Sequence, residues 1–477
     1  MKILNGQQKK GISFSNIQIP HTYVIIFTMI IIAAIMTYII PAGEYSRIKN
    51  AAGVTMVNPS SFKFTEQHPA GLMGIFSAVP SGLKATASLV FFLFIIGGVF
   101  QIINCTGTIN ILVNKMSRAF AGREQLIIPV FLFTFSIGGA LMGMSNEVLA
   151  FVPIGIMLAR KSGFDAAVGT AMVTMGALAG FSAGPMNPFT VGVAQSIAEL
   201  PMYSGIGLRI VIQLTFLVIA SLYLMRYAMK VKADPSCSIV ANLEAEEKAI
   251  AAAQAEAGEC EGTIHHLLVM AVFLGGLAYI VYGVFRYEWG ISDMQPIFMA
   301  MGILGGLVGG LGPSRIAREF ITGAKSLAFG ALVIGFARGI LVVMQDGMIL
   351  DTIVHYLASW LQALPSYCTA LGMFFIHFVL NFFIPSGSGQ AAATMPLFVP
   401  LADVTGITRQ VAVLAFQLGD GISNGINPTS SNMNSFLGVA KISYPQWVRF
   451  AGPLILMWEI TAALFVAGAS CFGYGPF

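Results

Sequence analysis

Residues 419–434, GDGISNGINPTSSNMN, interrupt a largely apolar stretch that runs from 408 to 441. Pro428 lacks a backbone donor and stops a helix, so we predict two helical halves joined by non-helical backbone. Residues 180–190, GFSAGPMNPFT, interrupt the stretch 166–200 in the same way. Carbonyls freed before such a break suit a small cation, and the helix N-terminus after it suits an anionic group. We therefore expect two discontinuous helices with polar breaks.

The composition indicates that lipid surrounds these broken helices. Only 10% of the 477 residues are charged, against roughly 25% in soluble globular proteins. Hydrophobic residues make up 56%, and the mean hydropathy is +0.80. One aqueous domain has too little interior for that much apolar surface, and the apolar runs lack the alternation of a transmembrane barrel. The predicted fold class is an all-α polytopic membrane protein.

Several function classes lack their sequence signatures. The five cysteines are scattered without CxxC or His-partnered spacing, so we expect neither a disulfide framework nor a cysteine metal site. We expect no cofactor other than a coupling ion, Na⁺ or H⁺. There is no Walker A or HExxH sequence, which leaves an ATP-driven pump and a zinc protease unsupported. We attribute the net charge of +4 to cytoplasmic loops and expect no nucleic-acid partner.

Apolar runs of about 20 residues predict nine full spans, at 22–41, 87–106, 166–200, 205–226, 264–287, 291–312, 328–345, 408–441 and 447–470. Two further apolar regions, 125–160 and 366–403, are cut in the middle by polar or Gly-rich residues. Each half is too short to cross, so we expect two re-entrant hairpins whose tips lie inside the protein. Residues 107–121, 314–327 and 346–364 mix charged and apolar side chains and are predicted to be interfacial helices.

The Lys and Arg residues orient these segments. Three lysines in residues 1–21 predict a cytoplasmic N-terminus, and basic residues flanking 125–160 predict that the first hairpin enters and leaves from the cytoplasm. The second hairpin is then expected to enter from outside, where the C-terminus also lies. The charged stretch 227–262 is predicted to be a cytoplasmic linker, and the polar loop 42–70 to be extracytoplasmic. The predicted location is the bacterial cytoplasmic (inner) membrane.

Comparing the chain with itself indicates an internal repeat. At an offset of 243 residues, 145–185 and 388–428 share seven identities, four of them at Gly or Pro. The first repeat is predicted to occupy 22–226, and a linking span with the second repeat to occupy 263–477. One hairpin enters from inside and the other from outside, so the repeats are inverted. Inverted repeats with broken helices are the architecture of secondary transporters, whose site lies where the two breaks meet.

The polar side chains of the two breaks form the first candidate site. Their hydroxyl and amide groups add oxygens and donors to the freed backbone groups, although about half of them are expected only to patch the broken backbone. The substrate-binding candidates are Asn187, Thr190, Asn424, Asn427 and Thr429, Ser423 is a candidate for ion coupling, and Ser182, Ser430, Ser431 and Asn432 are further members of the set.

Several ionisable residues fall at predicted membrane depth, where a charge costs about 2.5 to 3.5 kcal/mol and function is the default interpretation. Glu147, at the first hairpin tip, is expected to coordinate a cation, carry a proton, pair with a cationic substrate or cap a helix. Arg338 is expected to bind a substrate carboxylate or to pair with Glu147 or Asp420. Asp420 is the next coupling candidate, ahead of Asp346 and Glu459, and His377 and Asn381 are weaker candidates.

These motifs resemble the YfcC family, which belongs with the anaerobic four-carbon dicarboxylate carriers of the ion transporter superfamily. The resemblance rests on SNE at 145–147, GPMNP at 184–188, PSGSG at 385–389 and NGINPT at 424–429, and it extends over about 18–455. It implies paired cation and substrate sites, a homodimer and an elevator-like movement. By resemblance, Ser145, Asn146, Asn187, Ser388, Asn424 and Asn427 inherit these roles, with a Na⁺ ion near Ser145 and Asn146 and with Ser388 among the substrate-binding residues.

Two departures keep the substrate open. In sodium–dicarboxylate carriers both tips read Ser-Asn-Thr, whereas here Glu147 replaces the first Thr and Ser-Gly-Gln at 388–390 replaces the second motif. We predict a secondary active transporter for an amino acid, including a basic one, or a carboxylate, coupled to H⁺ or Na⁺ or to solute exchange. The alternative is a cation/proton exchanger or channel without an organic substrate. A membrane enzyme ranks third because no nucleophile–base pair is visible.

Overall fold

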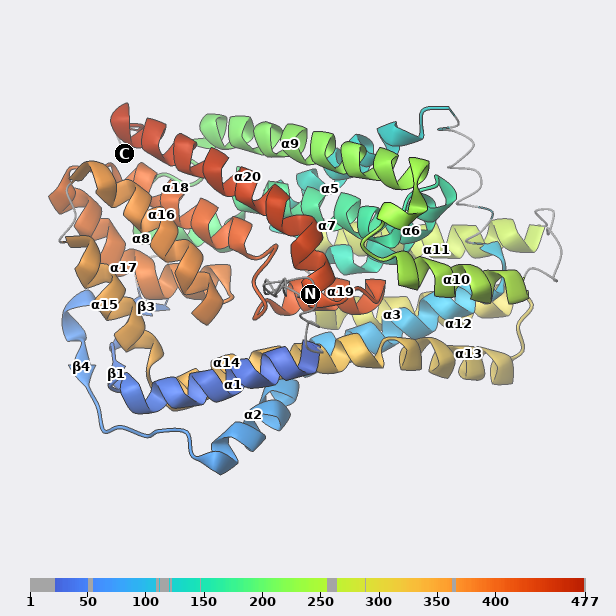
Figure 1. The fold of residues 1–477 in the computed structure, drawn as a ribbon, viewed down its shortest axis with the longest axis horizontal. Helices are drawn as coiled ribbons and strands as arrows, with labels where there is room; N and C mark the ends of the chain where they lie inside the picture. Colours follow the sequence, from blue (N-terminus) through green and yellow to red (C-terminus); the bar gives the residue numbers. More distant parts are fainter. Residues whose placement is uncertain are drawn as a thin grey trace, which may run out of the picture.

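The computed structural model describes residues 22–49, 55–108, 111, 120, 122–145, 147–254, 264–287, 289–362 and 366–475. Helices dominate this part of the chain and are arranged in two layers (Figure 1). Asn146, one of the predicted coupling residues, and most of the predicted interfacial helix 107–121 lie outside the described residues.

The lower layer in Figure 1 is built around α14 and α3. Its helices are α1 (Thr22–Ile39), α2 (Leu72–Ala85), α3 (Ala87–Cys105), α11 (Ile264–Tyr287), α12 (Ile291–Val308), α13 (Pro313–Ser326) and α14 (Ala328–Asp346). α14 packs against α1 and α2, while α12 and α13 pack against α3. Helix α15 (Leu350–Gln362) then leads toward the upper layer.

The upper layer contains both predicted hairpins and both predicted broken helices. It comprises η3 (Glu124–Leu126), α5 (Ile127–Met142), η4 (Glu147–Phe151), α6 (Val152–Lys161), α7 (Ala166–Ala183), η5 (Pro188–Gly192), α8 (Val193–Ile197), α9 (Ile206–Ala233), α16 (Ser366–Phe383), α17 (Gly387–Thr405), α18 (Arg409–Ser423), α19 (Ser431–Ala440) and α20 (Tyr444–Cys471). α7 packs against α5, α6 and α9, α18 packs against α16, α17 and α20, and α7 and α18 contact each other. The C-terminal ends of α7 and α18 therefore meet, with Gly421 against Ser182 and Gly184 against Gln417.

The predominantly helical fold was predicted, but the short strands of the loop 42–70 were not. Strand β1 (Gly43–Glu44) pairs with β4 (Lys63–Phe64), and β2 (Arg47–Lys49) pairs with β3 (Thr55–Val57), both antiparallel, with the short turn η2 (Pro59–Ser61) between β3 and β4. This polar loop has no helical period, so its backbone groups pair with one another. The loop also docks on α15, where the Tyr45 amide donates to Asp351 Oδ2 at 2.9 Å.

One additional helix and one helix boundary differ from the sequence prediction. Helix α2 falls where no helix was predicted, and its Gly82 lies against the Gly335 carbonyl of α14. Helix α9 continues to Ala233 rather than ending near 226, and the linker that follows contains η6 (Pro235–Cys237) and α10 (Ala241–Gln254). The predicted interfacial helices 314–327 and 346–364 correspond in position to α13 and α15.

Five helices in the described residues are long and apolar enough to cross a membrane, or six if α13 and α14 form one bent span. They cover Ala87–Cys105, Glu124–Leu141, Ala166–Ile197, Ile206–Ala233 and Tyr444–Cys471. Length and composition do not place a helix relative to a bilayer, so the nine spans, the two re-entrant hairpins and the inverted repeat stay predictions.

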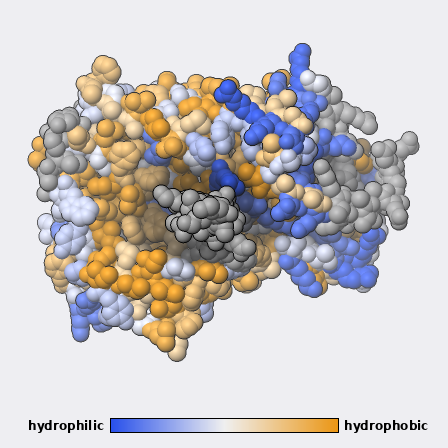
Figure 2. Space-filling view, viewed as in Figure 1, coloured by the Kyte–Doolittle hydropathy of each residue, from blue (hydrophilic) through white to orange (hydrophobic). Residues whose placement is uncertain are grey.

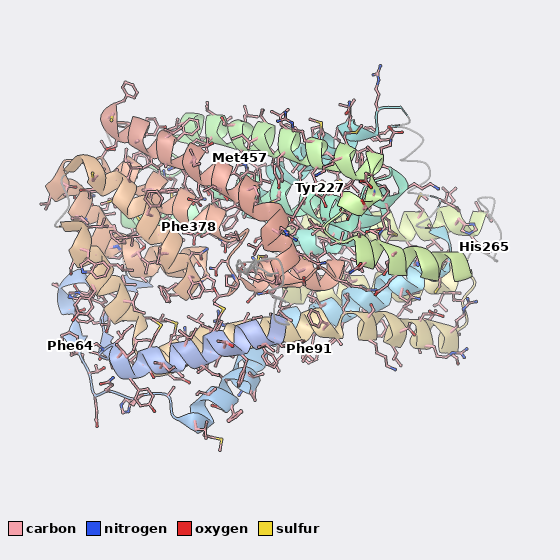
Figure 3. All side chains as sticks on the ribbon, in the orientation of Figure 1. Phe64, Phe91, Tyr227, His265, Phe378 and Met457 are labelled. Carbon is pink, nitrogen blue, oxygen red and sulfur yellow. The ribbon has the colours of Figure 1, made fainter. Side chains whose placement is uncertain are left out.

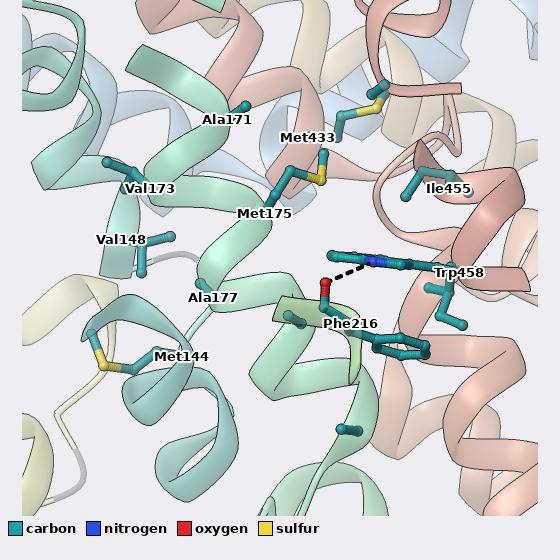
Figure 4. Packing of buried hydrophobic residues seen from close by; sticks show 14 of the residues in the cluster. Met144, Val148, Ala171, Val173, Met175, Ala177, Phe216, Met433, Ile455 and Trp458 are labelled. Atoms are coloured by element: carbon teal, nitrogen blue, oxygen red, sulfur yellow. Dashed lines mark hydrogen bonds between the residues drawn. The ribbon is translucent and has the colours of Figure 1, made fainter. Parts of the chain in front are cut away.

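The interior is closely packed and the outside is apolar. Trp458 of α20 stacks on Phe216 of α9 with ring centroids 5.0 Å apart, and its Nε1 donates to the Phe216 carbonyl at 3.1 Å (Figure 4). Hydrophobic residues cover most of the face shown in Figure 2, and hydrophilic residues gather at its right-hand end, over α10 and α13. Such a surface suits lipid along the helices and water at their ends.

Candidate functional site

The two helix breaks are closed by the same local contact. α7 ends before Gly184, whose φ of +55° is a conformation that glycine adopts without strain. Beyond it, Asn187 Oδ1 accepts a hydrogen bond from the Phe189 amide at 3.0 Å. After α18, Asn427 Oδ1 accepts from the Thr429 amide at 3.1 Å. Each Asn precedes a Pro and turns the chain toward the next helix.

This shared contact corrects the predicted alignment of the repeats. The offset of 243 pairs Pro185 with Pro428, whereas the two Asn-Pro pairs lie 240 residues apart. The helices before the breaks do begin 243 residues apart. The Asp165 side chain caps α7 by accepting from the Val168 amide, and the Thr408 side chain caps α18 by accepting from the Val411 amide. α7 has 18 residues and α18 has 15, so the change of offset lies inside the first half of the broken helix.

Glycine lets the hairpin arms lie directly on the broken helices. A Cβ on Gly176 of α7 would stand 2.6 Å from the Leu132 carbonyl oxygen of α5. A Cβ on Gly419 of α18 would stand 2.5 Å from the Phe374 carbonyl oxygen of α16. No side chain fits at either crossing, and these two glycines are a pair matched at the offset of 243. Both hairpin tips are thereby brought to the level of the breaks.

The first hairpin tip contacts both breaks. The position of a Cβ on Gly143 would be 2.6 Å from Asn187 Oδ1 of the first break. Ser145 Oγ accepts a hydrogen bond from Asn432 Nδ2, beyond the second break, at 2.5 Å. The Ser145 amide donates to Glu147 Oε2 at 3.0 Å, which is the contact of a carboxylate that caps the turn. The structure thus places Gly143 of this tip beside Asn187, and Ser145 beside Asn432.

The second hairpin tip contacts the first break and Asp420. The position of a Cβ on Gly387 would be 2.3 Å from Thr190 Cγ2 and 3.2 Å from Asp420 Oδ2. Ser386 caps α17 by accepting from the Gly389 amide, whereas Ser388, a predicted substrate ligand, is exposed. Thr190 and Asp420 are therefore neighbours at this tip, although they belong to different halves of the chain.

Asp420 is buried with both carboxylate oxygens unpartnered in the described part of the chain. Other buried oxygens on the surrounding helices also lack a hydrogen-bond partner there: Ser182 Oγ, Thr190 Oγ1, Asn381 Oδ1, Gln390 Oε1 and Gln417 Oε1. A buried polar group without a partner costs about 1 to 3 kcal/mol, and more when it is charged. Because these groups include several acceptors and one carboxylate, the site is suited to a cation or a proton.

The predicted substrate ligands of the second break use their donors on the backbone. Asn424 Nδ2 donates to the Asp420 carbonyl at 2.8 Å, Asn427 Nδ2 to the Asn381 carbonyl at 2.7 Å, and Thr429 Oγ1 to the Phe382 carbonyl at 2.9 Å. The predicted coupling residue Ser423 donates to the Gly419 carbonyl at 2.8 Å. In this conformation these four side chains stabilise the broken backbone. Asn187 differs, since its Nδ2 is buried without a partner among the described residues.

Arg338 lies on α14, in the lower layer. Its Nε is buried without a hydrogen-bond partner, and none of the ion pairs of the described residues joins it to Glu147 or Asp420. Glu459 on α20 also has one buried oxygen, Oε1, without a partner in this part of the chain.

Sequence reasoning missed two buried polar contributors. Gln417 Nε2 donates to the Phe181 and Ser182 carbonyls at 2.6 and 3.1 Å and so joins the two broken helices. Its signal was available, because a residue three positions before Asp420 shares its helix face. Arg209 is 1% exposed, and it donates to the Ser204 carbonyl and to Gln410 at 2.8 and 3.1 Å. In the sequence it looks like an ordinary basic residue at the start of a span.

The chain matches known proteins along nearly its whole length. The family model described as DcuC, C4-dicarboxylate anaerobic carrier, matches residues 19–470. The chain is 33% identical to the "Putative basic amino acid antiporter YfcC" of Escherichia coli, with 95% of this chain and 97% of that protein covered. It is 27% identical to an uncharacterized protein of Haemophilus influenzae, with 94% and 96% covered.

Two solved transporters are similar over most of their length. They are the YdaH transporter of Alcanivorax borkumensis, at 14% identity with 95% of this chain and 99% of that chain covered, and Neisseria gonorrhoeae MtrF, described with a class of antimetabolite efflux pumps, at 16% identity with 94% and 95% covered. Both TM-scores are 0.41. The family match over residues 19–470 confirms the resemblance seen in the hairpin tips and helix breaks. The chain therefore belongs to the C4-dicarboxylate anaerobic carrier family of membrane transporters.

Proposed function

We propose that this chain is a secondary active transporter that moves a small organic ion, an amino acid or a carboxylate, across the bacterial cytoplasmic membrane. The observation that carries the proposal is Asp420, a buried carboxylate with two unpartnered oxygens among the described residues, between the second hairpin tip and the first helix break. An ionisable group at membrane depth is costly, and it is retained where it serves a transport cycle.

In this proposal Asp420 holds the coupling ion, which is Na⁺ or H⁺. Na⁺ is a hard cation and prefers oxygen ligands, like Ca²⁺ and Mg²⁺, and Thr190 offers a buried hydroxyl beside the same hairpin tip. The predicted Na⁺ position near Ser145 and Asn146 is a second candidate, because the Ser145 hydroxyl accepts from Asn432 and keeps one further lone pair. Glu147 then stabilises the first tip, where it accepts from the Ser145 amide.

The organic substrate carries a carboxylate in this proposal, and Arg338 binds it. A guanidinium can hold a carboxylate through two parallel hydrogen bonds, and the buried Nε of Arg338 is without a partner in the described part of the chain. A basic amino acid would also present an ammonium group, which Asp420 can pair with in exchange for the coupling ion. The name of the E. coli relative, an antiporter for basic amino acids, and that of the family, C4-dicarboxylate carriers, support both substrate classes.

We further propose an elevator-like movement of the upper layer against the lower layer within a homodimer. The upper layer is internally cross-linked where α5 lies on α7, α16 lies on α18 and Gln417 joins the two broken helices. The lower layer carries Arg338, so movement of one layer past the other would change the distance between Arg338 and Asp420. In this proposal the movement of the upper layer, which carries Asp420, exposes the site to each side of the membrane in turn.

The second candidate function is a cation/proton exchanger without an organic substrate. The unpartnered oxygens around Asp420 favour it, because they need only a cation. In that case Arg338 would act on the electrostatic field of the ion path rather than on a substrate.

Charge movement on solid-supported membranes tests both candidates. Purified protein in proteoliposomes is exposed to concentration jumps of arginine, lysine, ornithine, neutral amino acids, acetate, lactate and succinate, each with and without Na⁺ at two pH values. A current seen with one solute class identifies the substrate, and its Na⁺ and pH dependence identifies the coupling ion. Currents from Na⁺ or pH jumps alone would favour the exchanger. Counterflow of radiolabelled solutes covers electroneutral exchange, and silence in both assays would refute the transporter proposal.

A further inference from the structure

A cavity lies between the two layers, and Asp420 is not among the residues that line it. It has a volume of about 180 Å³, which is roughly ten or more water-sized positions. Its walls come from α3, α6, α13 and the end of α19, with Leu327 between α13 and α14. The polar lining residues are Gln101, Asn104, Ser326 and Lys441, and the apolar ones include Phe100 and Met157. The cavity therefore combines an apolar body with a few polar groups, as small-molecule sites do.

Lys441 carries the charge of this lining within the described residues. It follows α19 with a φ of +57°, so the helix stops there and its side chain leaves the helix axis. Its Nζ lies 3.2 Å from Glu247 Oε1 of the linker helix α10. Of the amides, Gln101 already donates to Glu319 Oε2 at 3.0 Å. Lys441 is thus the group of this cavity best suited to an anion.

Glu247 is held in place by the docking of the linker helix. Arg160, at the end of α6, donates through Nε to both Glu244 oxygens at 3.0 and 3.1 Å, and its Nη1 lies 3.4 Å from Glu247 Oε2. Glu244 also accepts from the Ala166 amide at 2.9 Å. Before α10, Tyr227 of α9, which is labelled in Figure 3, donates to Asp165 Oδ2 at 2.8 Å and accepts from the Ile239 amide of the linker at 3.0 Å. Glu247 is therefore a positioned carboxylate shared between two cations.

We propose that this cavity is a substrate subsite on the cytoplasmic side, where Lys441 binds the carboxylate of the transported ion and Glu247 acts as the internal carboxylate that the substrate displaces. This inference rests on the proposed function, and it specifies that the substrate carries a carboxylate. It also rests on the orientation that the Lys and Arg pattern predicts, in which the linker 227–262 lies in the cytoplasm. Displacement exchanges one charge-assisted pair for another, so the subsite binds weakly and releases its solute readily.

The test is the transport KM measured separately from each face of the membrane. Everted vesicles expose the cytoplasmic face and right-side-out vesicles expose the other face. The probes are radiolabelled succinate and arginine. Lys441→Gln keeps the side-chain length and removes the charge, and Glu247→Gln removes the internal competitor. Lys63→Gln is the matched control, because Lys63 pairs with Glu44 at 2.8 Å in the loop predicted to lie outside.

We expect Lys441→Gln to raise the KM about three- to tenfold in everted vesicles for the transported probe and to leave it unchanged in right-side-out vesicles. Glu247→Gln should lower the everted KM about two- to threefold, because Lys441 is then free for the substrate. The control Lys63→Gln should leave the KM measured in everted vesicles at its wild-type value. A variant that only damages folding would lower the maximal rate from both faces instead of changing the KM from one.

Each outcome of this test decides one point. If Lys441→Gln and Glu247→Gln have the wild-type KM from both faces, the subsite is overturned and the proposed transporter stands. A KM rise from the right-side-out face would place the cavity outside and would also overturn the cytoplasmic assignment. A wild-type protein that transports neither probe nor any solute of the panel would refute the proposed function itself.

Discussion

Replacing Asp420 by Asn should separate ion coupling from stability. Asn keeps the shape of the side chain but removes a buried charge, and both oxygens of Asp420 lack a partner within the described residues. An unpaired buried carboxylate costs several kcal/mol, whereas an unpartnered amide costs about 1 to 3 kcal/mol. We therefore expect Asp420→Asn to stabilise the ion-free protein by about 1 to 3 kcal/mol when the wild-type carboxylate is ionised.

The same substitution should strongly lower the affinity of the site for the coupling ion. Two unit charges about 4 Å apart at an effective dielectric constant of 20 interact with about 4 kcal/mol, which corresponds to roughly a thousandfold in affinity. Transport coupled to that ion should therefore fall below detection at ordinary ion concentrations. Thermal unfolding in detergent measures the stability, with and without Na⁺, and solid-supported membrane currents measure the transport. Na⁺ should stabilise the wild type but not the variant if Na⁺ is the coupling ion.

Asp403→Asn is the control, since Asp403 is more exposed and pairs with Arg409 at 2.8 Å. We expect it to change stability by less than about 0.5 kcal/mol and to leave coupling intact. The stability gain of Asp420→Asn should shrink as the pH is lowered, because protonation removes the charge from the wild type only. A variant that transports like the wild type, with the same Na⁺ and pH dependence, would show that Asp420 does not hold the coupling ion.

Three further predictions follow from the same geometry. Gly180→Ala should destabilise the protein by about 1 to 3 kcal/mol or more, because its Cβ would collide with the Ser136 carbonyl oxygen. Gly275→Ala is the control: its Cβ would have nothing within 4 Å, so thermal unfolding should show a neutral or slightly stabilising effect. Arg338→Gln should raise the KM for carboxylate substrates about tenfold or more, with Arg338→Lys intermediate; equal KM values would remove Arg338 from the site. Asn187→Ala should lower the free energy of unfolding by roughly 1 kcal/mol, and Asn427→Ala should lower it more, because Asn427 also donates to the Asn381 carbonyl. Equal losses of stability would contradict the difference in their contacts.

The positions of the helix breaks could be predicted from the sequence because their causes are local. Pro and Asn change the hydrogen bonding of their own segment, and the structure interrupts helices at 184–187 and 424–430, inside the predicted stretches. The alignment of the two breaks could not be fixed in the same way. Three residues fewer in α18 than in α7 shift the register, and nothing local in the sequence marks where they are missing.

Helix α2 shows a limit of the same kind. Its segment contains Pro80 and Lys84, so it has neither the length nor the uniform hydropathy of a span. Its helix is stabilised by packing of Gly82 against the Gly335 carbonyl of α14, a contact between distant parts of the chain. A signal was available in the sequence: Gly82 and Lys84 recur 241 residues later as Gly323 and Lys325, in the segment 314–327 that is predicted to be helical.

Composition and the positions of Gly and Pro were enough to predict a helical membrane protein and the two places where its helices break, because these signals act locally. Which polar side chains of those breaks remain without a hydrogen-bond partner depends on the three-dimensional fold. Asn424, Asn427 and Thr429 are occupied by backbone carbonyls, whereas Asp420 and Thr190 meet at the second hairpin tip without partners in the described residues. That outcome depends on helix crossings between residues far apart in the chain, and a hydrogen-bond partner is known only once those crossings are.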